Sequence, residues 1–353
     1  MKFRIELKQN STWLFCHFSI ITGLAHPKVR SRKHSHRRLP NKLETMPSSL
    51  KTHSPFAISL AGYGSCALAG TFWGTGFYFG KIALTELNVG HMVLYRFLFA
   101  CLGLLPMLRP PRFSGKDWSL LLTAAFLGVP LQFMTQFYGL SFTTVSHAAL
   151  MVGTMPVILA VGASIFTHER LDRKGWIALA GSTIGVTLIT LGGARQSAAH
   201  GPSLTGDLLV VLSLIIALAW ILISRDLMHR NSPMSVTVWT ILTGTAMLVV
   251  WVLLMDGPPP VHGITTQVWI ACAAGGLLCT SAATFLWNWG IHHVPASRAG
   301  VFLNLEPALG SILGVELLGD KLGPDAWVGG ALILAAAIVL TTTGKSQPEM
   351  VLE

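Results

Sequence analysis

The sequence predicts an all-α integral membrane protein with ten transmembrane helices, arranged as two inverted five-helix repeats. Three observations predict this class: the composition, a series of long apolar runs, and an internal repeat. Hydrophobic residues make up 52% of the 353-residue chain and charged residues only 11%, whereas a soluble domain carries about 25% charged residues. The composition is therefore that of a membrane protein.

Most of the positive charge lies in the N-terminal tail, residues 1–56. Eleven Lys or Arg residues there accompany only Glu6 and Glu44, so the tail carries +9 of the net charge of +10. Because the remaining chain is nearly neutral, the basicity does not indicate nucleic acid as a partner. Such a tail cannot bury enough apolar surface to fold. We expect it to be disordered and cytoplasmic, or to lie upstream of the true start, with Met46 as the alternative initiator.

The apolar runs are long enough to cross a hydrocarbon core of about 30 Å, which takes about 20 residues. They occupy residues 57–80, 89–108, 118–139, 145–167, 175–193, 205–224, 235–255, 268–291, 297–318 and 326–343. The connections between them are short and leave no room for a soluble catalytic domain.

Motifs for catalysis or metal binding are not found. The His168-Glu169 pair lacks the second histidine of a zinc-protease motif, because position 172 is Asp. The five cysteines are scattered and show no metal or disulfide spacing. We therefore predict no catalytic residues, no metal, no cofactor, no enzyme activity and no ATP-driven transport.

The charges of the loops predict the orientation. Successive loops lie on alternate sides of the membrane, so their basic residues fall into two sets. The side with the larger set is expected to be the cytoplasm. Ten basic residues lie in one set and three, Lys81, Arg195 and Lys321, in the other. Both termini, including residues 344–353, are then cytoplasmic.

The chain repeats itself after 151 residues. Without a gap, Trp118 aligns with Trp269, Pro156 with Pro307, and the segment 169–171 with 320–322. We therefore assign residues 57–193 and 205–343 to two repeats. Since each repeat has an odd number of helices, the copies must cross the membrane in opposite senses. Inverted repeats are typical of secondary transporters, whose site lies at the repeat interface; a channel or a non-transporting scaffold stays an alternative.

Two charges are expected deep in the membrane. Glu306 lies nine residues into its run, about 14 Å deep in a core of about 30 Å. Arg96 lies at a depth that differs by about 4 Å. A charge there costs at least about 2–3 kcal/mol and must face a cavity or a partner. The two groups either form a structural ion pair or are the charged ends of a substrate site, with Glu306 also able to carry a proton.

Prolines stand at matching positions of the two repeats. Pro156 and Pro307 lack an N–H, so the carbonyls of Val152 and Leu303 are expected to lose their helical donors. These helix bends would turn free carbonyls toward a shared cavity, although a proline can also simply curve a membrane helix.

Weaker candidates are polar or aromatic residues within the runs, for which interhelical hydrogen bonds, packing or interfacial anchoring are the alternatives. They are Gln132, Gln136, Asn288, Asn304, Trp73, Tyr95 and Trp220. His147, at the start of a run, is expected at the membrane interface.

The two segments "TMPVILAVGASIFTHERLDRKGWIALAGSTIGVTLITLGG" (154–193) and "LEPALGSILGVELLGDKLGPDAWVGGALILAAAIVLTTTG" (305–344) resemble the EamA-type family of the drug/metabolite transporter superfamily. Each has a proline, a helix of small and apolar residues, an acid-base pair and a glycine-rich span. The second copy differs slightly from the family pattern, because it has Gly319-Asp320-Lys321 in place of the usual Gly-Glu-Arg. The resemblance covers about residues 60–344 and implies a plasma-membrane carrier, often an exporter of amino acids, metabolites or drugs.

These observations predict a secondary transporter in the plasma or inner membrane that moves a small organic molecule by alternating access. The expected partners are this substrate and membrane lipid, without nucleic acid; a homodimer is left open. The alternative is a membrane scaffold or sensor that binds a small molecule without transporting it.

Overall fold

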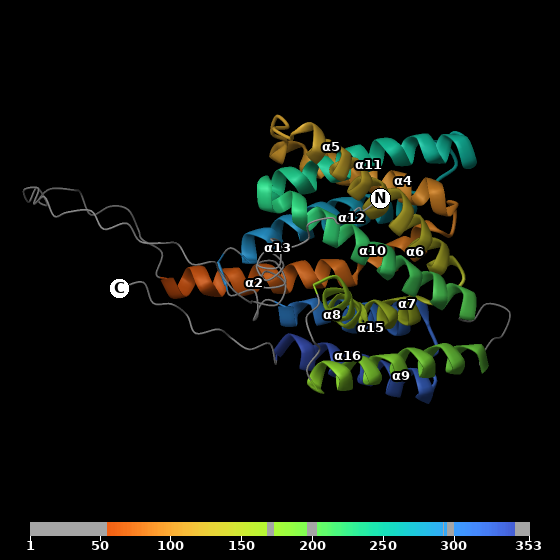
Figure 1. Ribbon diagram of the computed structural model, residues 1–353. Helices are drawn as coiled ribbons and strands as arrows, with labels where there is room; N and C mark the ends of the chain where they lie inside the picture. Colours follow the sequence, from red (N-terminus) through yellow and green to blue (C-terminus); the bar gives the residue numbers. More distant parts are fainter. Residues whose placement is uncertain (1–54, 168–172, 196–202, 292, 295–299, 343–353) are drawn as a thin grey trace, which may run out of the picture.

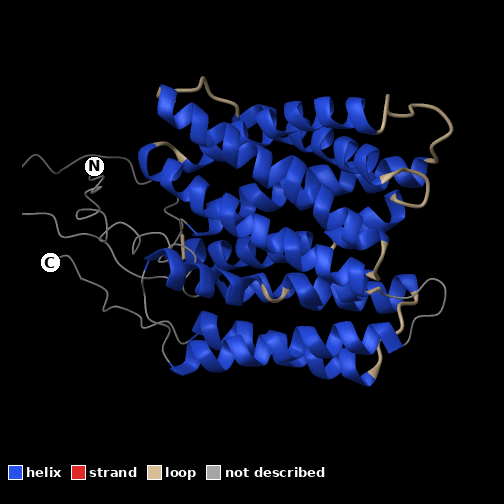
Figure 2. Cartoon of the chain, turned by 45° about the vertical axis from the view of Figure 1, so that its right-hand side comes forward, coloured by secondary structure: helices blue, strands red, loops and turns tan. Residues whose placement is uncertain are grey.

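The structure is a bundle of α-helices packed with their axes roughly side by side (Figure 2). It is a computed structural model that describes residues 55–167, 173–195, 203–291, 293–294 and 300–342. No strand occurs within these ranges. The predicted tail lies outside the described residues, except for its last two positions.

The helices follow the apolar runs of the sequence. In chain order they are α2 (Pro55–Gly74), α3 (Gly76–Ala83), α4 (Val89–Leu104), α5 (Gly115–Phe126), α6 (Gln132–Ser141), α7 (Val145–Val152), α8 (Met155–Thr167), α9 (Arg173–Arg195), α10 (Leu204–Arg230), α11 (Pro233–Met255), α12 (Thr266–Gly276), α13 (Ala283–Ile291), α15 (Leu305–Leu318) and α16 (Pro324–Thr342). Two 3-10 segments, η1 (Leu105–Met107) and η4 (Gly300–Asn304), and two π-helical turns, η2 (Leu127–Leu131) and η3 (Leu277–Ala282), join some of them.

Five helical stretches are long and apolar enough to cross a membrane. They are Val89–Met107, Gly115–Ser141, Leu204–Met228, Pro233–Met255 and Thr266–Ile291. Shorter apolar helices occupy Val145–Leu159, Trp176–Ile189 and Pro324–Val339. The structure thus shows an all-helical protein with at least five helices of membrane-spanning length among the described residues.

Polar side chains start the helices that follow short loops. Asn88 accepts a hydrogen bond from the backbone N–H of His91 at the start of α4, and Ser203 accepts one from Gly206 at the start of α10. Ser114 and Thr144 cap α5 and α7 in the same way. Each cap satisfies one backbone N–H that has no partner inside the helix.

The outside of the bundle is apolar, as lipid contact requires. On α10, the side chains of Leu208, Leu212 and Ile215 recur every three to four residues and are about half exposed. This spacing places them on one helix face. An apolar face of this length would be an aggregation hazard in water, and it fits hydrocarbon.

The interruptions of the helices occur at equivalent places in the two halves. The π-helical turn η2, moved by 151 positions, falls on residues 278–282, within η3. The gap between α7 and α8 at residues 153–154 falls on 304–305, where η4 gives way to α15. Both halves therefore break their helices at the same two points.

The first helix of each half packs on the third apolar run of the other half. A Cβ added to Gly139 of α6 would lie 2.9 Å from the carbonyl oxygen of Gly206 on α10. Likewise, a Cβ on Gly290 of α13 would lie 3.0 Å from the carbonyl oxygen of Gly62 on α2. The same contact is thus made twice, once in each direction between the halves, as expected for two units related by an approximate twofold axis.

The last helices of the two halves, α9 and α16, lie side by side at one edge of the bundle (Figure 1). Their axes approach at Gly185 and Gly329. A Cβ on Gly185 would stand 2.6 Å from the carbonyl oxygen of Gly329, whereas a Cβ on Gly181, one turn earlier, would meet nothing within 4 Å.

We expect Gly185→Ala and Gly181→Ala to change stability in opposite directions. Alanine favours helix by up to about 1 kcal/mol over glycine, so Gly181→Ala should leave the thermal unfolding midpoint unchanged or raise it. At Gly185 the new methyl group forces the backbones apart, which costs roughly 1–3 kcal/mol and should lower the midpoint. The measurement is thermal unfolding of the purified protein in detergent. Equal midpoints for the two variants would contradict the close approach of α9 and α16.

Candidate functional site

Arg96 lies inside the bundle, on α4, with only 7% of its surface exposed. Its Nε donates a hydrogen bond to the Thr280 hydroxyl of η3 at 3.3 Å. That hydroxyl donates in turn to the carbonyl oxygen of Gly275, at 3.1 Å, because the π-helical turn brings residue 280 within reach of residue 275. The turn therefore fixes the acceptor that orients the arginine.

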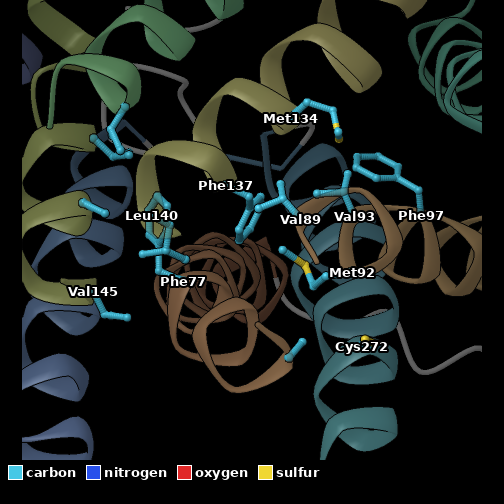
Figure 3. Close-up of a cluster of buried hydrophobic side chains, with 14 of the residues drawn as sticks. Phe77, Val89, Met92, Val93, Phe97, Met134, Phe137, Leu140, Val145 and Cys272 are labelled. Carbon is cyan, nitrogen blue, oxygen red and sulfur yellow. The ribbon is translucent and has the colours of Figure 1, made fainter. Parts of the chain in front are cut away.

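Aromatic rings of α6 flank the guanidinium group. Its Cζ lies 5.3 Å from the ring centres of both Phe133 and Phe137, a distance at which a cation is attracted by the ring faces. The two rings are nearly parallel, with centres 6.2 Å apart. Figure 3 draws Phe137 with Phe77 and Phe97 in the surrounding apolar core. Phe137 is fully buried, and Phe133 is half-buried.

The terminal nitrogens of Arg96 keep their hydrogen-bonding capacity free. In the part of the chain that the structure describes, no group accepts a hydrogen bond from Nη1 or Nη2, and no carboxylate pairs with them within 4.0 Å. They point toward Gly76, where a Cβ would lie 3.6 and 3.7 Å from them. An unpaired buried charge costs several kcal/mol, so this arrangement favours the approach of an anion.

Glu306 lies in the first turn of α15, next to the break between α2 and α3 in the first apolar run. Its backbone packs on Gly74, whose added Cβ would lie 3.3 Å from the Glu306 Cα. Gly76, two residues further on, faces Arg96, so the segment 74–76 contacts both residues. They lie close enough to interact electrostatically. Glu306 forms no hydrogen bond or ion pair with any described residue, yet it keeps part of its surface uncovered.

The broken helices meet next to this site. A Cβ on Gly153, in the gap between α7 and α8, would lie 3.3 Å from the Cβ of Pro307 on α15. Gly310, one turn beyond Pro307, packs against Ala149 of α7. The interruption in one half therefore touches the interruption in the other.

The prolines stand differently from the expectation. Each was expected to bend a continuous helix, yet Pro156 is the second residue of α8 and Pro307 the third of α15. In a first turn the missing N–H leaves no bond unmade. The helices are interrupted just before the prolines, at residues 153–154 and 300–304. The backbone N–H groups of Gly153 and Thr154 still donate to carbonyl oxygens of α7.

The weaker candidates scatter. Tyr95 donates from its hydroxyl to the Pro260 carbonyl oxygen at 2.6 Å, in a loop. Asn288 bonds within its own helix to Thr284. Asn304 ends η4 immediately before α15.

The remaining four are internal. Trp73 packs on Trp287, with ring centres 5.4 Å apart, and Trp220 covers Gly128 in η2. Gln132 and Gln136 are buried on α6. The Gln132 side-chain oxygen has no partner among the described residues. Each glutamine directly precedes one of the two phenylalanines in the sequence.

A second polar group, here called the end cluster, joins the two halves where α7 and α10 begin. The imidazole Nδ1 of His147 lies 3.3 Å from an Asp207 carboxylate oxygen, and both side chains are 2% exposed. The Thr143 hydroxyl donates to the other oxygen at 2.6 Å. Asp320 accepts from the backbone N–H of Ser146 at 2.8 Å. His147 was expected at the membrane interface, and the structure adds that its side chain is buried against Asp207 inside the protein.

Sequence reasoning missed three residues around Arg96: Phe133, Phe137 and Thr280. The spacing of Phe133 and Phe137 by four residues shows that they share a helix face, but not that this face meets Arg96. Thr280 reaches Arg96 through a π-helical turn, for which no signal is visible in a single sequence.

A helical bundle with apolar outer faces, matched interruptions in two halves and buried charges is a multi-pass membrane protein built like a transporter. The EamA-like transporter family matches residues 60–191 and 204–342. The chain therefore belongs to the EamA-like transporter family and is a membrane transporter, which confirms the resemblance seen in the sequence.

Several relatives are also transporters. The uncharacterized transporter YetK of Bacillus subtilis (strain 168) is 25% identical over 295 residues, which cover 82% of this chain and 89% of the relative. An uncharacterized transporter of Archaeoglobus fulgidus is 26% identical over 290 residues, 80% of this chain and 97% of the relative. A solved crystal structure matches with a TM-score of 0.55 over 81% of this chain and 98% of its own, at 18% identity, which shows a shared fold alone.

Proposed function

We propose that the chain crosses the membrane ten times, as two five-helix repeats of opposite orientation, and carries a small organic molecule without using ATP. The matched interruptions and the reciprocal packing of the first helices support two equivalent units. Because each unit has an odd number of spans, the twofold axis between them lies in the membrane plane.

The substrate site in this proposal is the space between Arg96 and Glu306. The observation that carries it is the buried guanidinium group with two unpaired nitrogens, beside the point where two broken helices touch. Broken helices at mid-membrane are typical of transporter sites. Glu306, partly uncovered and without a hydrogen bond to a described residue, is the group that carries a proton.

Transport proceeds by alternating access, with the two repeats rocking about this site. In this proposal the end cluster closes one side, and its contacts between the first repeat and Asp207 and Asp320 of the second support this role. By the orientation that the loop charges favour, this side is the outside. Export is the direction that the resemblance to the EamA-type family implies.

The test is counterflow in vesicles that contain the purified protein. Vesicles are loaded with one unlabelled compound at a time from a panel of amino acids, organic acids, amines and drugs, and uptake of the labelled compound is followed. A transporter gives a transient uptake at least several-fold above that of empty vesicles for one class of compound. A scaffold or sensor would show saturable binding and no counterflow with any of them.

The orientation is checked by single cysteines in a chain whose five native cysteines are replaced by alanine. Arg112 and Lys321 are both exposed, at opposite ends of the proposed spans. A membrane-impermeant thiol reagent added to intact cells should label Lys321→Cys and leave Arg112→Cys unlabelled until the cells are opened. The reverse pattern would invert the topology.

A further inference from the structure

We propose that Arg96 binds a carboxylate group of the transported molecule through its two terminal nitrogens. This inference rests on the proposed function and names the class of substrate: an organic acid with an apolar or aromatic body. It starts from the guanidinium group, which is more than nine-tenths buried and uses one of its five N–H donors on a described residue.

The shape of the site selects the anion. A guanidinium group presents two parallel N–H donors that match the two oxygens of a carboxylate. The position that a Cβ on Gly76 would take is equally far from both nitrogens, at 3.6 and 3.7 Å. A side chain at this position would be in van der Waals contact with both nitrogens and with the Cβ of Cys279, whereas glycine leaves the nitrogens uncovered on that side. Glycine at 76 therefore keeps the donors reachable.

The charge of the site favours a carboxylate over a phosphate. Around the guanidinium group, the described neighbours are Thr280, Cys279, Gly275 and the two phenylalanines, all of them uncharged. Glu306 adds a negative charge nearby. One cation balances one negative charge, so a carboxylate is matched when Glu306 carries its proton. A doubly charged phosphate would then still leave one charge uncompensated.

The aromatic rings supply the contact for the body of the molecule. Phe137 is buried and Phe133 is half-buried, and both rings lie 5.3 Å from the guanidinium carbon. In the proposal, a ring or chain attached to the bound carboxylate lies against Phe133. Aromatic pairs of this kind add about 0.5–1.5 kcal/mol beyond their buried area.

The experiment measures thermal stabilisation of the purified protein by acetate, phenylacetate and 3-phenylpropionate, each paired with its uncharged amide, and by inorganic phosphate. We expect concentration-dependent stabilisation by the acids, strongest for the two aromatic ones, and at least tenfold weaker binding of the amides and of phosphate. The inference would be overturned if an amide stabilised the protein as much as its acid does. It would also be overturned if none of the three acids stabilised the protein.

Two variants locate the binding. Arg96→Lys keeps the charge and removes the paired donors, and Gly76→Ala places a methyl group in ordinary contact with both nitrogens without a clash. Both should weaken phenylacetate binding at least tenfold. Gly64→Ala, where a Cβ meets nothing within 4 Å, is the matched control and should bind normally. Unchanged binding in Gly76→Ala would show that the acid sits elsewhere.

The outcomes separate this inference from transport itself. Counterflow of a compound without a carboxylate, together with no binding of the acids, would overturn the inference and leave the proposed function standing. Binding of phenylacetate at Arg96 without counterflow of any compound would overturn the proposed transport and leave the binding of a carboxylate at Arg96 standing.

Discussion

Glu306→Gln is expected to abolish proton-driven transport while leaving the protein in the membrane. Glutamine has nearly the same shape as glutamate and cannot release a proton, so it mimics the protonated acid permanently. Glu306 forms no hydrogen bond or ion pair with a described residue, so the replacement leaves no described partner unsatisfied. We therefore expect normal folding and a specific loss of coupling.

The measurement uses vesicles with an imposed pH gradient and the compound that gives counterflow. Wild-type protein should drive net movement of the compound in the direction opposite to proton flow, as proton-coupled export requires, and Glu306→Gln should reduce this net flux at least tenfold. Exchange of labelled for unlabelled compound without a gradient should persist, because exchange needs no net proton movement. The residual flux of the variant should no longer respond to pH.

Glu316→Gln is the matched control. Glu316 lies on the same helix, α15, and is exposed near its C-terminal end, so the variant should transport like the wild type. If Glu306→Gln retained net flux that still followed the pH gradient, Glu306 would not carry the coupled proton, and its interaction with Arg96 would be structural.

The sequence was enough to predict the helical class and the two repeats. The first depends on local composition, and the second on a match between segments 151 residues apart. A run of apolar residues must form helix in hydrocarbon, since every backbone group needs a partner. Arg96 and Glu306 were recognisable by the same reasoning, because a charge inside such a run is too costly to keep without a function or a partner.

What the sequence could not predict depends on contacts between distant residues. The π-helical turn η3 places Thr280 under Arg96, and the hydrogen bond across 184 positions is not encoded in any local pattern. His147 was expected at the interface because it follows a loop. Only the packing of α10 against α7 shows that Asp207 meets it inside the protein.

Neutralising Asp207 and Asp320 is expected to open the side of the protein that the end cluster closes. Both carboxylates belong to the second half and accept hydrogen bonds from the first half, at Thr143 and Ser146. Hydrogen bonds to charged groups contribute about 1.5–3 kcal/mol each. Asp207→Asn with Asp320→Asn weakens these bonds and removes the charge that faces His147, so the closed form loses stability relative to the open one.

The readout is the reaction of Cys279 with a membrane-impermeant thiol reagent added from outside. Cys279 is buried, and its Cβ would lie 3.8 Å from a Cβ on Gly76, beside the proposed substrate site. In a chain whose other four cysteines are alanine, the labelling rate follows the open fraction. A loss of about 1.5–3 kcal/mol corresponds to an increase of roughly 10- to 100-fold, as long as the open form stays the minority.

Asp226→Asn provides the comparison, because Asp226 lies at the opposite end of α10, where it pairs with Arg230 at the exposed surface. Exposed pairs contribute at most about 1 kcal/mol, and this one joins residues of a single helix, so labelling of Cys279 should not rise. If the double variant also labels at the wild-type rate, the end cluster does not close the path to Arg96. The path would then be blocked by the apolar packing of α7 against α15, where Gly310 meets Ala149. The rocking of the two repeats would have to separate those helices instead.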